Sequence, residues 1–194
     1  MYIKDGQIYT PDQVRAALPR MSIPDGADLS SLGYEQIINQ AAPSYDPITQ
    51  VAERGDPELV DGQWTRGWKI RSLNQSEIDA LFAEKMAAIQ AGKVRAMDGG
   101  FVHAGTLYDS DANARLAYLE LSVKLGQDAT YTTPWKASTG VWVTMTAALF
   151  AALQTTYEAH IAACFAWQAA REQELAAAYA LEDAAAMIAV AETM

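Results

Sequence analysis

Short runs of β-prone residues flank a two-residue turn at the beginning of the chain. Residues 2–4 and 7–9 carry aromatic and β-branched side chains, and Asp5-Gly6 lies between them. Asp-Gly readily adopts the positive φ angles of a tight turn, so this pattern predicts a β-hairpin. A short helix is expected next over 10–18, with Thr10 as its N-cap and a proline at its first position.

The following stretch has few signals of regular structure. Residues 22–57 are dense in proline, glycine, aspartate and serine, so we expect them to be mostly irregular, with one short strand over 34–39. A second Asp-Gly turn at 61–62 precedes the segment 63–70, whose aromatic and β-branched residues suit a strand. Residues 1–72 are therefore predicted to form a small, β-leaning module.

Helical spacing of apolar residues begins after this module. The residues that recur every three or four positions are Ile78, Leu81, Phe82, Met86 and Ile89. Ser76 and Asp79 resemble a capping box before them, and Gly92 fits the C′ position behind them. The sequence thus predicts a connecting helix over 73–92.

A flexible joint is expected behind that helix, because the two adjacent glycines Gly99-Gly100 are costly to order. We expect the modules to hinge at 93–100. The segment 101–108, with its aromatic and aliphatic residues, is then predicted to form a strand.

A small αβ domain follows the joint and is predicted to span 93–194. Asp109-Ser110-Asp111 supplies an N-cap and first-turn acids for a helix over 113–125, which Gly126 closes. The segment 134–144 carries tryptophan and valine around a Ser-Thr-Gly turn, which indicates a second hairpin. The whole chain is therefore expected to be of the α+β class.

Residues 146–194 contain no glycine and no proline and are rich in alanine, which predicts one long helix or two with a bend. Apolar residues keep a helical stripe up to Trp167, and the polar run 168–174 interrupts it. The last segment, 175–194, carries six larger apolar residues among alanines, which we take as candidate partner-binding residues: Leu175, Tyr179, Leu181, Met187, Ile188 and Val190. They would be buried against another chain, or the segment would fold back on the preceding helix with a bend in 168–174.

Composition narrows the classes of partner. The formal net charge of -10 disfavours binding to nucleic acid or to an anionic membrane face. The longest apolar tract, 175–190, is interrupted by Glu182-Asp183 and is too short to span a bilayer, so no transmembrane helix is expected. The beginning of the chain lacks the pattern of a signal peptide, which points to the cytoplasm in which the protein is made.

Candidates for chemistry are sparse. His160 and Cys164 are four residues apart and could share a helix face, but a structural zinc site needs four such donors. His103 alternates with apolar residues and is expected to have a structural role. Trp64 and Trp68 could stack on a sugar, yet the same spacing on a strand more often covers a core. We therefore expect no catalytic residue, no metal, no cofactor and no enzymatic activity.

Two parts of the chain resemble proteins of bacteriophage tails. The first resemblance is to the amino-terminal module of tail-fibre-associated proteins, in the order and approximate spacing of Met21–Pro24, Leu32–Tyr34, Pro43–Gln50 and Val60–Ile70. The second, over roughly 93–172, is to a phage-tail domain of unknown function and rests on Phe101, Gly105, Tyr108 to Asp111, Trp135, Val141 and Val143 to Thr146. An alanine-rich extension over 175–194 departs from that domain, which usually stops with a short charged helix end.

These resemblances imply a tail-associated structural protein, at the tail tip or fibre attachment region, that resides in the virion tail after synthesis in the host cytoplasm. Its expected partners are other phage tail proteins and further copies of itself. The amino-terminal module would dock, and the long helix would oligomerise, as in a coiled coil. Two alternatives stay open: a tail-fibre assembly chaperone that is absent from the virion, and a receptor- or glycan-binding protein.

Overall fold

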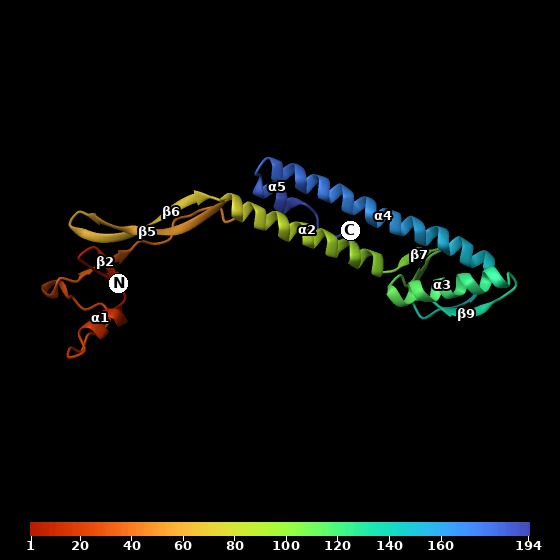
Figure 1. Cartoon of the computed structure of the whole chain (residues 1–194), viewed down its shortest axis with the longest axis horizontal. Coiled ribbons are helices and arrows are strands. Elements are labelled where there is room, and N and C mark those ends of the chain that lie inside the picture. Colours follow the sequence, from red (N-terminus) through yellow and green to blue (C-terminus); the bar gives the residue numbers. More distant parts are fainter. The chain divides into compact units, whose positions relative to one another are not determined.

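The computed structural model describes all 194 residues and divides into two compact units, Met1–Asn74 and Gln75–Met194 (Figure 1). The first unit contains small sheets and one short helix, and the second contains long helices with two short hairpins. The predicted α+β class is therefore confirmed. None of the helices is both long and apolar enough to cross a membrane.

The first unit begins with the predicted hairpin and helix. β1 (Tyr2–Lys4) pairs antiparallel with β2 (Gln7–Tyr9), and both turn residues between them have positive φ, at 50° and 77°. Helix α1 (Pro11–Ala17) starts with a complete capping box, in which the hydroxyl of Thr10 accepts a hydrogen bond from the backbone N–H of Gln13 at 3.2 Å. The Gln13 side chain accepts one in return from the backbone of Thr10 at 2.8 Å.

A small core forms around this hairpin. β3 (Glu35–Gln36) pairs with β1 on the side opposite β2, and a 3-10 turn at Ser30–Leu32 precedes it. The core residues are Tyr2, Val14, Ile23, Leu29 and Tyr34. Residues 22–34 belong to the stretch expected to be irregular over 22–57, and they pack on the sheet through Ile23, Leu29 and Tyr34, with Ala27 at the edge of the core.

The second sheet of this unit contains a longer hairpin than the sequence predicts. β5 (Gln50–Val60) and β6 (Gln63–Ser72) pair antiparallel across the Asp61-Gly62 turn, and β4 (Ile38–Asn39) joins β6 in parallel. The expectation that 50–57 is irregular is wrong, because pairing with β6 outweighs the weak local preference. Pro57 lies beside a shift of register on the edge strand β5, and edge strands and bulges are the places in a sheet where proline is tolerated.

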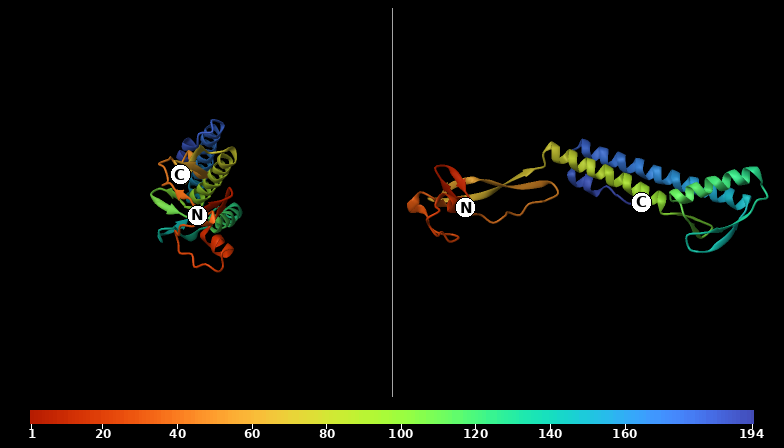
Figure 2. Two further views of the ribbon diagram at one scale, coloured as in Figure 1. Left: turned by 90° about the vertical axis from the view of Figure 1, so that its left-hand side faces the viewer. Right: turned by 60° about the horizontal axis from the view of Figure 1, so that its bottom comes forward.

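Two long helices dominate the second unit. α2 (Gln75–Asp98) and α4 (Ala147–Ala180) lie side by side and antiparallel, and the short α5 (Ala184–Ala189) folds back against both (Figures 1 and 2). Buried side chains between the three helices are Ile78, Ile89, Cys164, Leu175, Ala178, Ala184, Met187 and Val190. The connecting helix expected over 73–92 is therefore part of this packed unit.

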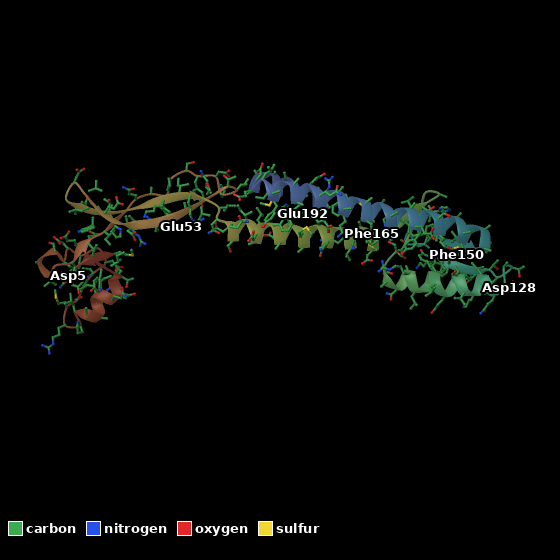
Figure 3. All side chains as sticks on the ribbon, turned by 45° about the horizontal axis from the view of Figure 1, so that its top comes forward. Asp5, Glu53, Asp128, Phe150, Phe165 and Glu192 are labelled. Carbon is green, nitrogen blue, oxygen red and sulfur yellow. The ribbon has the colours of Figure 1, made fainter.

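Both predicted ends of that helix are wrong. α2 starts at Gln75, and the carboxylate of Asp79 accepts hydrogen bonds from the Gln75 amide at 2.8 Å and the Tyr179 hydroxyl at 2.7 Å. The helix also continues past Gly92, which is buried inside it. A Cβ atom on Gly92 would lie 2.1 Å from the carbonyl oxygen of Glu192, so glycine stands there for close packing (Figure 3 labels Glu192 beside α2).

A pair of hairpins and one helix cap the far end of this unit. The predicted single strand over 101–108 is a hairpin, β7 (Phe101–His103) and β8 (Thr106–Tyr108), because Ala104 and Gly105 take positive φ angles of 48° and 82°. Helix α3 (Ala112–Gln127) follows and extends one residue past Gly126. The predicted second hairpin is confirmed as β9 (Thr133–Lys136) and β10 (Trp142–Met145).

Residues 93–100, expected to be a hinge, are held in place by helix α2 and by side-chain contacts. Residues 93–98 lie within α2, and the buried hydroxyl of Ser110 donates to the carbonyl oxygen of Met97 and accepts from the N–H of Gly100 at 2.9 Å. An ion pair between Arg115 and Asp98, at 3.1 Å, spans the same joint. The two units part at Asn74 and Gln75 rather than at 93–100.

The last helical segment folds back on the preceding helix, as one of the two predicted alternatives states. The bend, however, does not lie in 168–174. α4 runs unbroken through 168–174, and the chain reverses only behind it, where Glu182 has a φ of 53°. The carboxylate of Asp183 then accepts a hydrogen bond from Ala186 N–H at 2.9 Å and caps α5. Glu182-Asp183 therefore turns the chain within the apolar tract.

Candidate functional site

Helix α3 is held firmly at its amino end. The carboxylate of Asp111 accepts a hydrogen bond from the Ala114 N–H at 2.8 Å, which satisfies one of the free donors of the first turn. The hydroxyl of Tyr118 donates to the carbonyl oxygen of Asp109 at 2.8 Å. Together with the Arg115–Asp98 ion pair, these contacts fix the direction of the helix and hence the faces that it presents.

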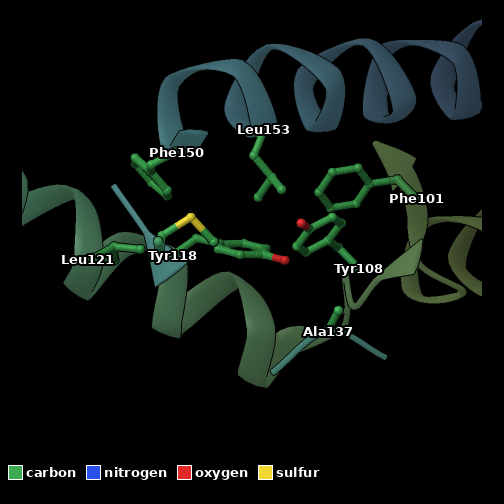
Figure 4. Close-up of a cluster of buried hydrophobic side chains, with 8 residues drawn as sticks. Phe101, Tyr108, Tyr118, Leu121, Ala137, Phe150 and Leu153 are labelled. Carbon is green, nitrogen blue, oxygen red and sulfur yellow. The ribbon is translucent and has the colours of Figure 1, made fainter. Parts of the chain in front are cut away.

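One face of α3 packs into an aromatic core. Tyr118 and Leu121 are buried there, and Ala114 and Leu125 pack at its edge. The remaining buried members are Phe101, Tyr108, Ala137, Met145, Phe150 and Leu153, most of which Figure 4 labels. The rings of Tyr118 and Trp135 are stacked with centroids 5.2 Å apart. This face gives the helix its ordinary, inward-facing apolar stripe.

A second apolar stripe lies on the opposite face of the same helix. Leu116, Leu119 and Val123 are 57%, 62% and 55% exposed. Their spacing of three and four residues places them on one side of the helix, about half a turn away from Tyr118 and Leu121. Surface helices of soluble proteins normally present polar residues on this side, so the stripe is a candidate contact surface.

An apolar groove of about 210 Å³ adjoins this stripe, between α3 and α4. Leu119 belongs to both the stripe and the groove wall. The other lining residues are Arg115, Tyr118, Ser122, Phe150, Leu153, Gln154, Tyr157 and Glu158. The stripe and groove thus form a continuous surface, which we call the α3 face: Leu116, Leu119, Val123 and the groove residues.

A different hollow, of about 290 Å³, lies on the other flank of α3 against strand β9. Trp135 lines it together with the carboxylates of Asp109 and Asp111 and the amide of Asn113. Both carboxylates already accept hydrogen bonds, from Ser138 at 2.7 Å and from the helix backbone. An indole beside carboxylate and amide groups can contact a sugar, so this hollow is the weaker of two candidate sites.

The six residues predicted to bind a partner divide into two groups. Leu175 and Met187 have no exposed surface, Val190 is 7% exposed, and Tyr179 packs on Phe82 with ring centroids 4.5 Å apart. These four side chains are used inside the chain, so they have little surface to offer another molecule. Only Leu181 and Ile188, at 79% and 39% exposed, face outward.

The residues considered for chemistry are occupied by structural contacts. The Nδ1 atom of His103 lies 2.8 Å from the hydroxyl of Thr156, and the Nε2 atom of His160 lies 3.1 Å from the carbonyl oxygen of Ala96. Cys164 is buried beside His160, with 3.8 Å between the sulfur and Nε2, and burial raises the pKa of its thiol. No three His, Cys, Asp or Glu side chains cluster as metal ligands would.

The tryptophans of the first unit are also engaged. The guanidinium of Arg54 lies over the Trp68 ring at 4.0 Å from its centroid, and the Trp68 N–H donates to the carbonyl oxygen of Gln40 at 3.2 Å. Trp64 is half-buried on the same strand. One face of the Trp68 ring is thus covered by a cation.

The α3 face was not predicted from the sequence, although the spacing of its apolar residues can be recognised there. The spacing of Leu116, Leu119 and Val123 is visible along the predicted helix, but so is that of Tyr118, Leu121 and Leu125. Two stripes on one helix predict that one is buried and the other free. Which of them faces the core depends on the hairpins β7–β8 and β9–β10, which pack on Tyr118.

Comparison with known proteins gives one match. Residues 80–192 match a family model described as a domain of unknown function, DUF4376. No curated protein and no solved structure matches the chain. The matched region covers more than half of the chain and reaches almost to its end, so the alanine-rich extension lies within the family model up to residue 192. This chain belongs to the DUF4376 family.

Proposed function

We propose that this protein is a bacteriophage tail-associated structural protein, at the tail tip or fibre attachment region, that acts through protein contacts and oligomerisation. The resemblance of both units to phage tail proteins supports the tail assignment. The observation that carries the mode of action is the α3 face, since Leu116, Leu119 and Val123 remain more than half exposed on an ordered helix. A contiguous exposed apolar surface is a common mark of a protein interface.

The first unit supplies the docking element in this proposal. Its long hairpin β5–β6 leaves β5 as an edge strand with unpaired backbone groups on one side. Leu59 and Val60, at the tip of this hairpin, are 58% and 47% exposed. An open strand edge with apolar side chains at its end suits pairing with a strand of another tail protein.

Purified virions test the proposal. A phage that encodes this chain is purified by density gradient, and its proteins are quantified by mass spectrometry against the major tail protein. Peptides at a fixed stoichiometry per particle are expected for a structural component. Absence from the virion, with presence in infected cells, would contradict the proposal and favour the tail-fibre assembly chaperone.

A glycan-binding role is the second candidate, and the hollow beside Trp135 is the observation that favours it. Its test is binding of the full chain to an array of bacterial surface glycans. Asn113→Ala is the suitable variant, because Asn113 is exposed and lines the hollow without packing in the core. Binding that this change abolishes would support the glycan role, and no binding to the array would remove it.

A further inference from the structure

We infer that the α3 face is the contact between two copies of this chain, and that the two α3 helices pair in parallel. This inference deepens the proposed function, because it specifies the oligomer through which that function acts. It also moves the oligomer contact away from the six residues of the last segment, four of which the fold already uses.

The spacing along the outer face is that of a coiled-coil seam. Ala112, Leu116, Leu119, Val123 and Gly126 follow one another at intervals of four, three, four and three residues, and all five are exposed. This alternation is a heptad pattern with leucine and valine at a and leucine at d. Valine at a with leucine at d favours two strands over three. The small end residues Ala112 and Gly126 allow the helices to approach closely.

Charge complementarity identifies a second copy as the occupant and sets its direction. Arg115 and Glu120 flank the seam on opposite sides, at the g and e positions. In a parallel pair, a g residue meets the e residue five positions further along the other helix, so Arg115 faces Glu120 of the second copy, twice. One nitrogen of the Arg115 guanidinium stays in the ion pair with Asp98 at 3.1 Å, and the other N–H donors of the group can bind Glu120. An antiparallel pair that is centred on Leu119 would instead bring the two Glu120 side chains together.

The groove extends this contact beyond the three apolar side chains. Arg115 lies on the groove wall, on the g side of the helix, which faces the e side of the second copy. Glu120 of that copy therefore reaches the mouth of the groove. Since three large side chains per helix make a small interface, we expect a dissociation constant in the range of about 1–100 µM.

The oligomeric state of the full chain tests the contact. Sedimentation equilibrium is expected to show a monomer–dimer equilibrium in this range. Leu119→Glu should weaken the dimer about 100-fold, because it places a carboxylate in the middle of the seam of both copies. Leu181→Glu is the matched control: it is the same change at an exposed leucine in the predicted C-terminal interface, and it should leave the dimer unchanged.

Disulfide trapping tests the direction. The natural Cys164 is fully buried, so an introduced surface cysteine is the accessible thiol. In a parallel pair each position faces its own copy, so Ala112→Cys and Val123→Cys, tested separately, should each yield a crosslinked dimer on mild oxidation. Thr155→Cys, on an exposed face of α4 outside the groove, is the control that should remain monomeric under the same conditions.

Three results would overturn the inference. The first is a chain that stays monomeric at about 200 µM, well above the expected dissociation constant. The second is a dimer that Leu181→Glu dissociates and Leu119→Glu does not. The third is a dimer in which neither Ala112→Cys nor Val123→Cys crosslinks, which would refute the parallel pairing. Each result is independent of whether virions contain the protein, so failure of the dimer and failure of the tail assignment are distinguishable.

Discussion

Gly92 and Gly126 are both helical glycines, and replacing each with alanine is expected to change stability in opposite directions. Alanine is favoured over glycine inside a helix by about 1 kcal/mol, so local propensity alone predicts a gain at both positions. The surroundings differ. A Cβ at Gly126 would meet no atom within 4 Å, whereas at Gly92 it would lie 2.1 Å from the Glu192 carbonyl oxygen and 3.0 Å from the Trp167 ring.

The contact at Gly92 is with backbone, so relief requires the segment around Glu192 to move away from α2. That segment holds Val190, which is 7% exposed and whose burial is worth about 1.5–3 kcal/mol. It also holds the Lys85–Glu192 ion pair at 2.6 Å, which contributes about 0.5–1 kcal/mol because the Glu192 side chain is 45% exposed and screened by solvent. Subtracting the gain in helix propensity, we expect Gly92→Ala to destabilise the second unit by about 1–3 kcal/mol.

Urea unfolding followed by circular dichroism at 222 nm measures both variants, because nearly all the helix of the chain belongs to the second unit. Gly92→Ala should lower the midpoint, and Gly126→Ala should raise it slightly, by a gain of at most about 1 kcal/mol near the helix end. A low protein concentration keeps both chains monomeric. If Gly92→Ala raised the midpoint as much as Gly126→Ala does, the close approach of Glu192 to α2 would be refuted.

Three further predictions concern single side chains. Ser110→Ala is expected to cost about 1–3 kcal/mol and to speed proteolysis at 98–100, since the half-buried N–H of Gly100 and carbonyl of Met97 lose their partner. An unchanged cleavage rate would contradict the role given to Ser110. Burial, followed by the charge of Asp109, raises the pKa of Tyr118 above its ordinary value of 10.0, so the folded state keeps this proton. Stability of the second unit should therefore be independent of this group below about pH 10 and fall above it, as the unfolded chain ionises; chemical denaturation of Tyr118→Phe should show a smaller fall. Burial also raises the pKa of Cys164, so the native thiol should react with a disulfide reagent at neutral pH many times more slowly than the thiol in urea, and equal rates would refute its burial.

Elements whose signals are local were predictable from the sequence. Asp5-Gly6 and Asp61-Gly62 form the predicted tight turns, and the capping box at Thr10 and the cap at Asp111 start their helices as expected. In each case the residues that interact are within four positions of each other, so the local sequence is enough to predict the turn or the helix start. The α+β class follows from these local elements.

The candidate site was only half predictable. The spacing of Leu116, Leu119 and Val123 in the sequence is enough to recognise the outer stripe of α3. Whether this stripe or the inner one is exposed depends on which face of the helix packs on the aromatic core. The six residues assigned to a partner illustrate the opposite case. The fold buries Leu175, Met187 and Val190 within one chain and packs the ring of Tyr179 on Phe82.

Contacts between distant residues decided the rest. Gly92 looks like a helix end, yet it is a contact point for Glu192, one hundred residues away. Residues 50–57 look irregular, yet pairing with β6 makes them a strand. The polar run 168–174 looks like a bend, yet α4 passes through it and reverses at Glu182. The sequence by itself determined the local turns, caps and apolar stripes, and the tertiary structure decided which glycine packs, which strand pairs and which stripe remains exposed, because those outcomes depend on partners far along the chain.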